Sequence, residues 1–334
     1  MSQVYGVLFL NYELRIGIMT PSITDSAVKV AMDVLASSPA STQEKIQMLI
    51  EMAQGFQKKP KAARDLWNAL SLYNQARDLC ADEDLLWKAR ANVGMASTLK
   101  AIPDVGAQLL LEAKEQLEEA IPILQQLALP EEVAEAQMNL GLVLQSLVPF
   151  NLARATDSIQ VYHKALQVFT CQDYPQEYAI LHNNIAIAYL SMPVTSERQY
   201  LYQGLAVQTF EEALKHIRLI DHPREYAMLH NNLGNALQYL PSTHPIDNII
   251  RAIAAYDEAL KVRDRQDTPL EYANTIANKA NALLNLPDDL DKPEFGNPQN
   301  IAKANAYYEE AVEIFTQYGQ IEQVQLINEL RVSG

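Results

Sequence analysis

The amino-acid sequence predicts an all-α fold, a solenoid of about six antiparallel helix pairs, and two repeated patterns carry that prediction. One is a proline-opened segment that recurs four times, and the other is a small-xxx-aromatic-xx-Ala spacing that recurs six times. The chain has 334 residues, 49% of them hydrophobic and only 11 of them glycine, so it can bury a sizeable core and is not a low-complexity polymer. Chain length does not give the number of domains in a repeat array, so the architecture is predicted from the repeats.

The N-terminal segment, residues 1–60, is expected to form a helical cap on a repeat array that occupies residues 61–334. Thr24–Ala36 and Ser41–Gln57 have helical patterns, and the second opens on Ser41-Thr42-Gln43-Glu44, a capping box. A cap is expected because the exposed end of an array would leave apolar surface in water. For Val4–Ile18, a strand, a loose arm and an upstream extension before a translation start at Met19 all stay open.

Each proline-opened segment is expected to be the first helix of a pair. The openings lie 45, 48 and 46 residues apart, and each segment closes on a second proline 18 or 19 residues later. Proline at the first helical position loses no hydrogen bond, because its missing N–H would have no helical partner there. A glutamate two residues later lies where the helix dipole favours negative charge. The four helices are predicted to begin at Pro130, Pro175, Pro223 and Pro269 and to end before Pro149, Pro193, Pro241 and Pro287.

The second helices carry the small-xxx-aromatic-xx-Ala spacing. The two small residues and the ring lie on one helical face, so a neighbouring helix can approach closely while the ring fills the remaining gap. The six occurrences are Ala69-Tyr73-Ala76, Ala113-Leu117-Ala120, Ser158-Tyr162-Ala165, Ala206-Phe210-Ala213, Ala252-Tyr256-Ala259 and Ala304-Tyr308-Ala311, with leucine in place of the ring in the second.

The first helices share an Asn-apolar-small pattern. Glycine within a helix costs about 1 kcal/mol relative to alanine, so its presence indicates close packing, here against the ring-bearing second helix. The pattern occurs at Asn92-Val93-Gly94, Asn139-Leu140-Gly141, Asn184-Ile185-Ala186, Asn232-Leu233-Gly234 and Asn278-Lys279-Ala280.

With these two motifs the chain resembles the tetratricopeptide repeat (TPR) family over roughly residues 60 to 320. Its repeats are longer than the family's period of about 34 residues. They are most similar to the long, Asn-Asn-Leu-Gly-bearing repeats of many bacterial, notably cyanobacterial, proteins. The resemblance implies a right-handed superhelical solenoid whose concave wall is lined by first helices, with ligands lying against that wall.

A series of asparagines is the candidate binding site on that wall. An amide offers both a donor and an acceptor, so a row of amides can hold the backbone of an extended peptide without dictating its sequence. The same side chains could instead bond neighbouring helices, and the two interpretations stay open. The candidate peptide-binding residues are Asn139, Asn183, Asn184, Asn231, Asn232, Asn235, Asn278 and Asn281.

Metal binding and catalysis are not predicted. His182 and His230 occupy matching places in two units, but no cysteine or carboxylate joins them at ligand spacing, so we expect a packing or groove-lining role. Asp288-Asp289-Leu290-Asp291, with Glu294, lacks the spacing of a calcium loop and is expected to be an exposed acidic loop. The sequence contains no nucleophile elbow, phosphate-binding glycine loop or C-x-x-C, so we expect neither enzyme activity nor a cofactor.

The charge restricts the class of partner. The formal net charge is −15, and all of it falls in residues 111–334, where a nucleic-acid backbone would be repelled. No apolar run approaches the roughly 20 residues that a membrane span needs. Two cysteines in so long a chain do not make a disulfide framework, so a cytoplasmic location is expected.

The predicted function is a non-catalytic adaptor, or scaffold, that binds a neutral or basic protein segment in its concave groove. The alternative is a peptide- or ligand-sensing regulator that signals through its N-terminal segment. A self-assembling scaffold is a third possibility, and the sequence leaves the oligomeric state open.

Overall fold

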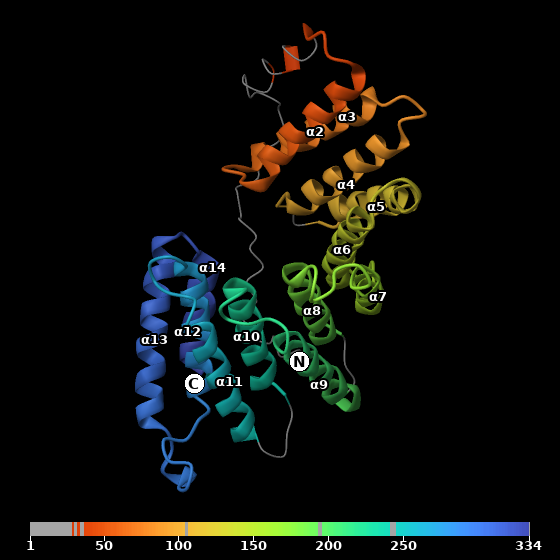
Figure 1. The fold of residues 1–334 in the computed structure, drawn as a ribbon. Helices are drawn as coiled ribbons and strands as arrows, with labels where there is room; N and C mark the ends of the chain where they lie inside the picture. The colour runs from red at the N-terminus through yellow and green to blue at the C-terminus, as the bar shows by residue number, and fades with distance from the viewer. Residues whose placement is uncertain are drawn as a thin grey trace. The chain divides into compact units, whose positions relative to one another are not determined.

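The computed structural model describes residues 29, 32, 33, 37–103, 106–192, 196–240 and 245–333 (Figure 1). Within this part of the chain the regular structure is entirely helical, as predicted, and the chain divides between Phe169 and Thr170 into two compact units. The predicted segment Val4–Ile18 and most of the predicted helix Thr24–Ala36 lie outside the described residues.

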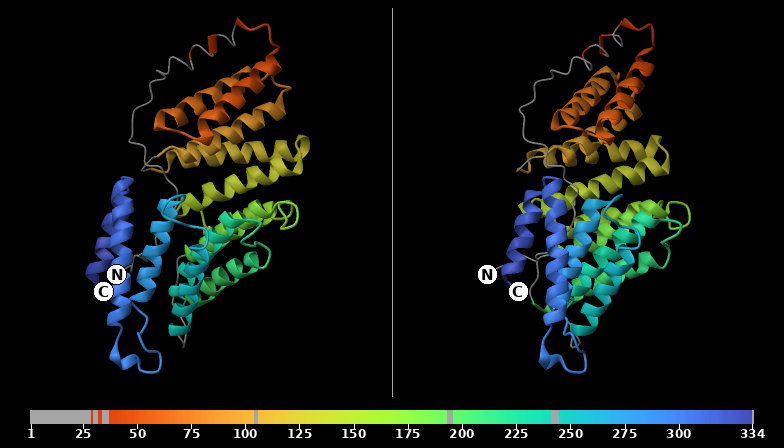
Figure 2. Two further views of the ribbon diagram at one scale, coloured as in Figure 1. Left: turned by 60° about the vertical axis from the view of Figure 1, so that its left-hand side comes forward. Right: turned by 90° about the vertical axis from the view of Figure 1, so that its left-hand side faces the viewer.

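The N-terminal unit contains three helix pairs, α2/α3, α4/α5 and α6/α7, whose members lie side by side (Figure 2). Helix α2 follows the predicted capping box, in which the Glu44 N–H donates to Ser41 Oγ and the Ser41 N–H to Glu44 Oε2. Because α2 packs on α3, it is the first helix of a pair, and Met32, which precedes α2, packs against the same apolar cluster. The helices are α2 (Thr42–Lys58), α3 (Ala63–Leu79), α4 (Leu85–Ala101), α5 (Gln108–Leu127), α6 (Pro130–Leu147) and α7 (Ala155–Ala165), with the 3-10 turn η1 (Val148–Phe150).

The C-terminal unit contains the pairs α8/α9, α10/α11 and α12/α13, and a final helix α14 that packs on α13. Ile327 of α14 is fully buried in the same apolar cluster as Phe315 of α13, so α14 covers the end of this unit. The helices are α8 (Pro175–Leu190), α9 (Ser196–Leu214), α10 (Pro223–Gln238), α11 (Pro245–Ala259), α12 (Pro269–Leu283), α13 (Pro298–Gln317) and α14 (Ile321–Ser333), with the 3-10 turn η2 (Pro293–Phe295).

The proline pattern placed the first helices correctly. α6, α8, α10 and α12 each begin on the predicted opening proline. α6 and α12 end before the closing Pro149 and Pro287, whereas Pro193 and Pro241 lie outside the described residues.

The second-helix pattern forms the core of both units. All eighteen of its residues, on α3, α5, α7, α9, α11 and α13, have at most 2% of their surface exposed. The glycines of the first helices lie directly under the rings: a Cβ added to Gly141 would fall 2.3 Å from a ring carbon of Tyr162, and one added to Gly234 would fall 2.6 Å from Tyr256. Gly94 differs, because the ring above it is Tyr73 of the preceding pair.

Candidate functional site

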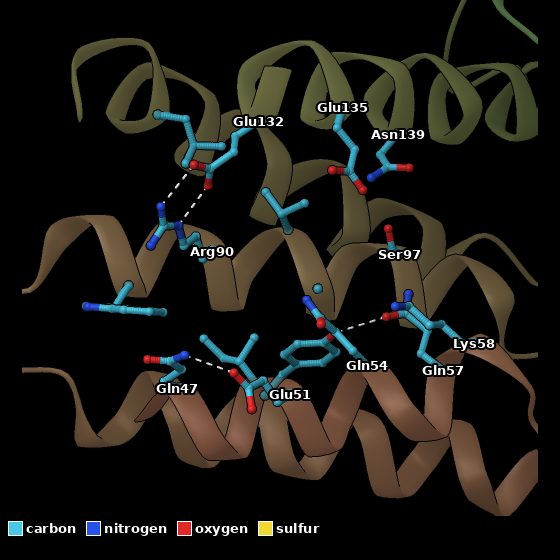
Figure 3. A pocket seen from close by; sticks show the side chains of 16 residues that line it. Gln47, Glu51, Gln54, Gln57, Lys58, Arg90, Ser97, Glu132, Glu135 and Asn139 are labelled. Atoms are coloured by element: carbon cyan, nitrogen blue, oxygen red, sulfur yellow. Dashed lines mark hydrogen bonds and ion pairs between the residues drawn. The ribbon is translucent and has the colours of Figure 1, made fainter. Parts of the chain in front are cut away.

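A groove with a volume of about 710 Å³ lies in the N-terminal unit (Figure 3). Its walls come from α2, α4 and α6, the three successive first helices, with Tyr73 of α3 and Leu124 of α5 below them. Apolar surface from Ile50, Trp87 and Val93 alternates with polar side chains. These polar side chains are Gln47, Glu51, Gln54, Gln57, Lys58, Arg90, Ser97, Glu132, Glu135 and Asn139.

One ion pair spans the groove wall between α4 and α6. Arg90 donates from Nε to Glu132 Oε2 at 2.7 Å and from Nη2 to Glu132 Oε1 at 2.9 Å. The hydrogen bond from Arg90 lowers the pKa of Glu132 below its ordinary value. The guanidinium carbon also lies 4.8 Å from the centroid of the Trp87 ring. Such a bidentate, stacked arginine holds its neighbours in one geometry, so this contact fixes the spacing of α4 and α6 and the orientation of Trp87.

The remaining charges make the groove weakly acidic. Glu51, whose Oε1 accepts from Gln47 Nε2 at 2.9 Å, comes from α2, and the exposed Glu135 comes from α6. Burial raises the pKa of Tyr73, which also lines the groove, above its ordinary value, and the negative charge of Glu135 raises that pKa further. With Arg90 and Glu132 neutralising each other, two carboxylates face one ammonium group, that of Lys58.

Of the asparagines predicted from the sequence, Asn139 lines this groove. It is half-buried on α6. The contributions of α2 and α4 to the groove were not among the predicted site residues, because α2 was expected to belong to a cap and only asparagines were chosen as candidates. The motif Asn92-Val93-Gly94 did identify α4 as a first helix, and Trp87 and Arg90, which precede it on the same helix, were not singled out.

In the C-terminal unit, four predicted asparagines bond one another across α8 and α10. Asn231 Nδ2 donates to Asn232 Oδ1 at 3.0 Å, Asn232 Nδ2 to Asn183 Oδ1 at 2.7 Å, and Asn183 Nδ2 to Asn184 Oδ1 at 3.3 Å. Asn183, Asn184 and Asn231 are buried, and Asn232 is half-buried. Of these bonds, only the one between Asn232 and Asn183 joins the two helices, so the geometry favours the helix-joining interpretation for Asn183. Contact of the three buried amides with a ligand stays a prediction.

A second set of amides joins α10 to α12. Asn281 Nδ2 donates to Gln238 Oε1 at 3.1 Å, and Gln238 Nε2 donates to the carbonyl of Asn278 at 3.1 Å. The Tyr256 hydroxyl, from α11, donates to Asn235 Oδ1 at 2.7 Å. Asn235 and Asn278 are buried, whereas Asn281 is half-buried. The amides that keep some exposure are therefore Asn232 and Asn281 in this unit and Asn139 in the other.

The two repeat histidines pack against tyrosines one turn earlier on their helices. The ring centroids of His182 and Tyr178 are 4.1 Å apart, and those of His230 and Tyr226 are 4.3 Å apart. Burial lowers the pKa of His230 to about 4, so it is neutral at physiological pH. In the described part of the chain no three His, Cys, Asp or Glu side chains cluster as metal ligands would.

None of the described helices has the length and hydropathy that crossing a bilayer requires. No protein-family model and no curated protein matches the sequence. A solved structure of the TPR2AB domain of yeast Sti1 in complex with pHSP90 is similar, at 17% identity and a TM-score of 0.30, over 87% of this chain and 98% of that chain. At this TM-score the two backbones do not superpose as wholes, so the assignment of repeats rests on the helix pairs described above. The chain is a helical-repeat protein in which first helices, proline-opened in α6, α8, α10 and α12, alternate with second helices of the small-xxx-aromatic-xx-Ala type, in agreement with the tetratricopeptide resemblance of its sequence.

Proposed function

We propose that the chain is a non-catalytic adaptor that holds an extended segment of another protein in the groove between α2, α4 and α6. The observation that supports this most directly is the groove itself, a cavity of about 710 Å³ in which three successive first helices present apolar surface and amides together. Side-chain amides bond peptide groups of any sequence, and the indole and aliphatic surfaces accept apolar side chains. Helices packed about 10 Å apart span about 20 Å over three, a distance that about six extended residues cover.

The partner segment is proposed to be neutral or basic. The groove contributes Glu51 and Glu135 against Lys58, and the whole chain has a formal charge of −15. Such a field favours the approach of basic segments and repels phosphate backbones and anionic lipid surfaces.

The eight predicted asparagines divide into two proposed roles. Direct contact with the segment in the groove is assigned to Asn139. Asn232 and Asn281 keep some exposure in the C-terminal unit, and their contact with a ligand of that unit stays a prediction. The buried asparagines, all in the C-terminal unit, are proposed to hold the packing of that unit through the hydrogen bonds described above. These are Asn183, Asn184, Asn231, Asn235 and Asn278.

Selection from a phage library of random peptides about nine residues long, with the full chain as bait, tests the proposal. We expect enriched peptides that carry lysine or arginine next to an apolar residue. Trp87→Ala should weaken their binding at least about tenfold, because the indole forms an apolar wall of the groove. Failure to enrich any peptide, or equal binding by Trp87→Ala, would contradict the proposal.

A pair of charge variants tests the electrostatic part separately. The double variant Glu51→Lys with Glu135→Lys should weaken binding of the basic peptides at least about tenfold. This loss of affinity should grow as the salt concentration is lowered. Glu115→Lys with Glu119→Lys makes the same change in net charge on the exposed face of α5, away from the groove, and should leave affinity within about twofold. Equal effects of the two double variants would show that only net charge matters.

The alternative, a ligand-sensing regulator that signals through its N-terminal segment, stays a prediction because residues 1–28 lie outside the described part of the chain. Salt-dependent retention of the purified chain on DNA would support it.

A further inference from the structure

The loop between α12 and α13, residues 288–296, is held in one conformation at its base. The Asp288 carboxylate accepts hydrogen bonds from the N–H groups of Gln299 and Asn300 in the first turn of α13, both at 2.8 Å. The Asp288 N–H donates to the carbonyl of Gly296 at 3.1 Å, which closes the loop. Asn297 and Asn300 donate from their side chains to the carbonyls of Leu284 and Leu286.

The outer part of the loop is also ordered by its own hydrogen bonds. The Asp291 N–H donates to Asp289 Oδ1 at 2.9 Å, and the Phe295 N–H donates to the Lys292 carbonyl at 3.1 Å within η2. Gly296 has φ of +76°, a conformation that favours glycine and returns the chain to α13. In Figures 1 and 2 the loop projects beyond the ends of α12 and α13.

This ordered loop presents two large apolar side chains to solvent. Phe295 has 71% of its surface exposed and Leu290 has 54%. The only ring contact of Phe295 within the described residues is the Lys292 ammonium, 5.9 Å from the ring centroid. Burial of apolar surface away from water is favourable, so a fixed, protruding pair of apolar side chains is a feature of docking sites.

The charges around the pair restrict what can cover it. Asp289, Asp291 and Glu294 surround Leu290 and Phe295, against the single cation Lys292. An anionic membrane or a nucleic acid would be repelled by this net negative charge, and a second copy of a chain with a formal charge of −15 is disfavoured for the same reason. A protein surface with basic residues around an apolar pocket complements both features.

We propose that this loop is a second docking element, which inserts Phe295 and Leu290 into an apolar pocket with a basic rim on a partner protein. It is independent of the groove between α2, α4 and α6, so one chain can engage two proteins.

Photo-crosslinking identifies the occupant. The full chain carrying p-benzoylphenylalanine in place of Phe295 is irradiated in an extract of the source cells, and the products are identified by mass spectrometry. The same probe in place of Ile220 is the control, because Ile220 is 93% exposed in the turn between α9 and α10 and lies outside the loop. We expect one protein to crosslink from position 295 and not from position 220. A crosslinked second copy, a crosslinked lipid, no product, or the same product from both positions would overturn the proposal.

The identified protein is then purified and titrated against the full-length chain by calorimetry. Phe295→Ser should raise the Kd at least about tenfold, and Glu294→Lys should raise it and reduce its dependence on salt. Ile220→Ser should leave the Kd unchanged, and urea unfolding should show equal stability for all three variants because each changed side chain is exposed. Unchanged affinity of Phe295→Ser would overturn the proposal even if the crosslink forms.

Discussion

At the scale of single residues, two helices pack closely where a glycine of the first helix faces an aromatic ring of the second. Gly141 allows Tyr162 to lie against the backbone of α6, and the Tyr162 hydroxyl donates to Gln145 Oε1 at 2.9 Å, which holds the ring in place. Gly55 lies inside α2 with no atom within 4 Å of an added Cβ. The same residue type therefore has a packing role at one position and none at the other.

Alanine substitutions at these two glycines should have opposite effects on stability. Gly141→Ala should lower the free energy of unfolding by about 1–3 kcal/mol, because the new methyl displaces the ring. Gly55→Ala should raise it by about 0.5–1 kcal/mol, since alanine is the better helix former and finds open space. Urea denaturation measures both, and two changes of the same sign would contradict the packing argument.

The tyrosine hydroxyls of the second helices depend on one position in the first helix. Gln57 accepts from Tyr73, Gln145 accepts from Tyr162, and Gln238 donates to the Tyr256 hydroxyl. The corresponding position is Leu284, the C-cap of α12, and the buried Tyr308 hydroxyl has no hydrogen-bond partner among the described residues.

Phenylalanine substitutions distinguish the two situations. Tyr256→Phe should destabilise the protein by about 1–3 kcal/mol, because it leaves the buried Asn235 amide oxygen without its donor. Tyr308→Phe should be neutral or stabilising, because it removes a buried hydroxyl that makes no bond. Thermal unfolding of the two variants, compared with the unsubstituted chain, measures the two changes in stability. A larger loss of stability for Tyr308→Phe than for Tyr256→Phe would contradict this argument.

His230 gives a pH dependence whose sign is fixed by burial. Its pKa is about 4 in the folded chain, below the ordinary value of 6.5, so the unfolded chain takes up a proton that the folded chain does not. The contribution of His230 to the free energy of unfolding is fully present above about pH 6.5 and declines as the pH falls towards 4. His230→Gln should therefore lose less stability than the unsubstituted chain between about pH 7 and about pH 5 in urea titrations. Parallel curves for the two proteins would show that His230 contributes nothing.

At the scale of elements, the sequence was most informative where a backbone constraint marked a boundary. Pro130, Pro175, Pro223 and Pro269 fix helix starts because proline is compatible with the first turn and little else in a helix. α2 and α4 begin without proline, and α2 was consequently expected to be part of a cap, although it packs on α3 as the first helix of a pair. The boundary predicted at residue 60 stays a prediction.

The final helix α14 is expected to stabilise the C-terminal unit through one face. Ile327 is fully buried, whereas Ile321 on the same helix is 68% exposed. Ile327→Ala should cost about 2–5 kcal/mol through the cavity it leaves, and Ile321→Ala should change stability by less than about 0.5 kcal/mol. Differential scanning calorimetry measures the two losses, and equal values would mean that α14 does not close the core.

The candidate site was less predictable than the fold for a physical reason. An asparagine has the same donor and acceptor whether it faces a ligand or a neighbouring helix, so the repeat position of Asn183, Asn231 or Asn235 could not reveal its partner. Asn183 bonds Asn232, 49 residues away, Asn235 accepts from Tyr256, 21 residues away, and Asn231 bonds its sequence neighbour Asn232. The groove likewise depends on Trp87 and Arg90, and the ion pair between Arg90 and Glu132 joins two repeats.

At the scale of the whole molecule, the two proposed docking surfaces belong to different units of the chain. The groove between α2, α4 and α6 lies within the N-terminal unit, and the loop at residues 288–296 lies within the C-terminal unit.

Fluorine NMR can show whether a peptide binds in the groove between α2, α4 and α6, because the chain has two tryptophans and only Trp87 lines the groove. The full chain is labelled with 5-fluorotryptophan, its two signals are assigned with Trp67→Phe, and it is titrated with a basic peptide from the phage selection. The account predicts that the Trp87 signal shifts and saturates while the Trp67 signal stays in place. A peptide that binds to saturation and leaves the Trp87 signal unmoved would contradict it.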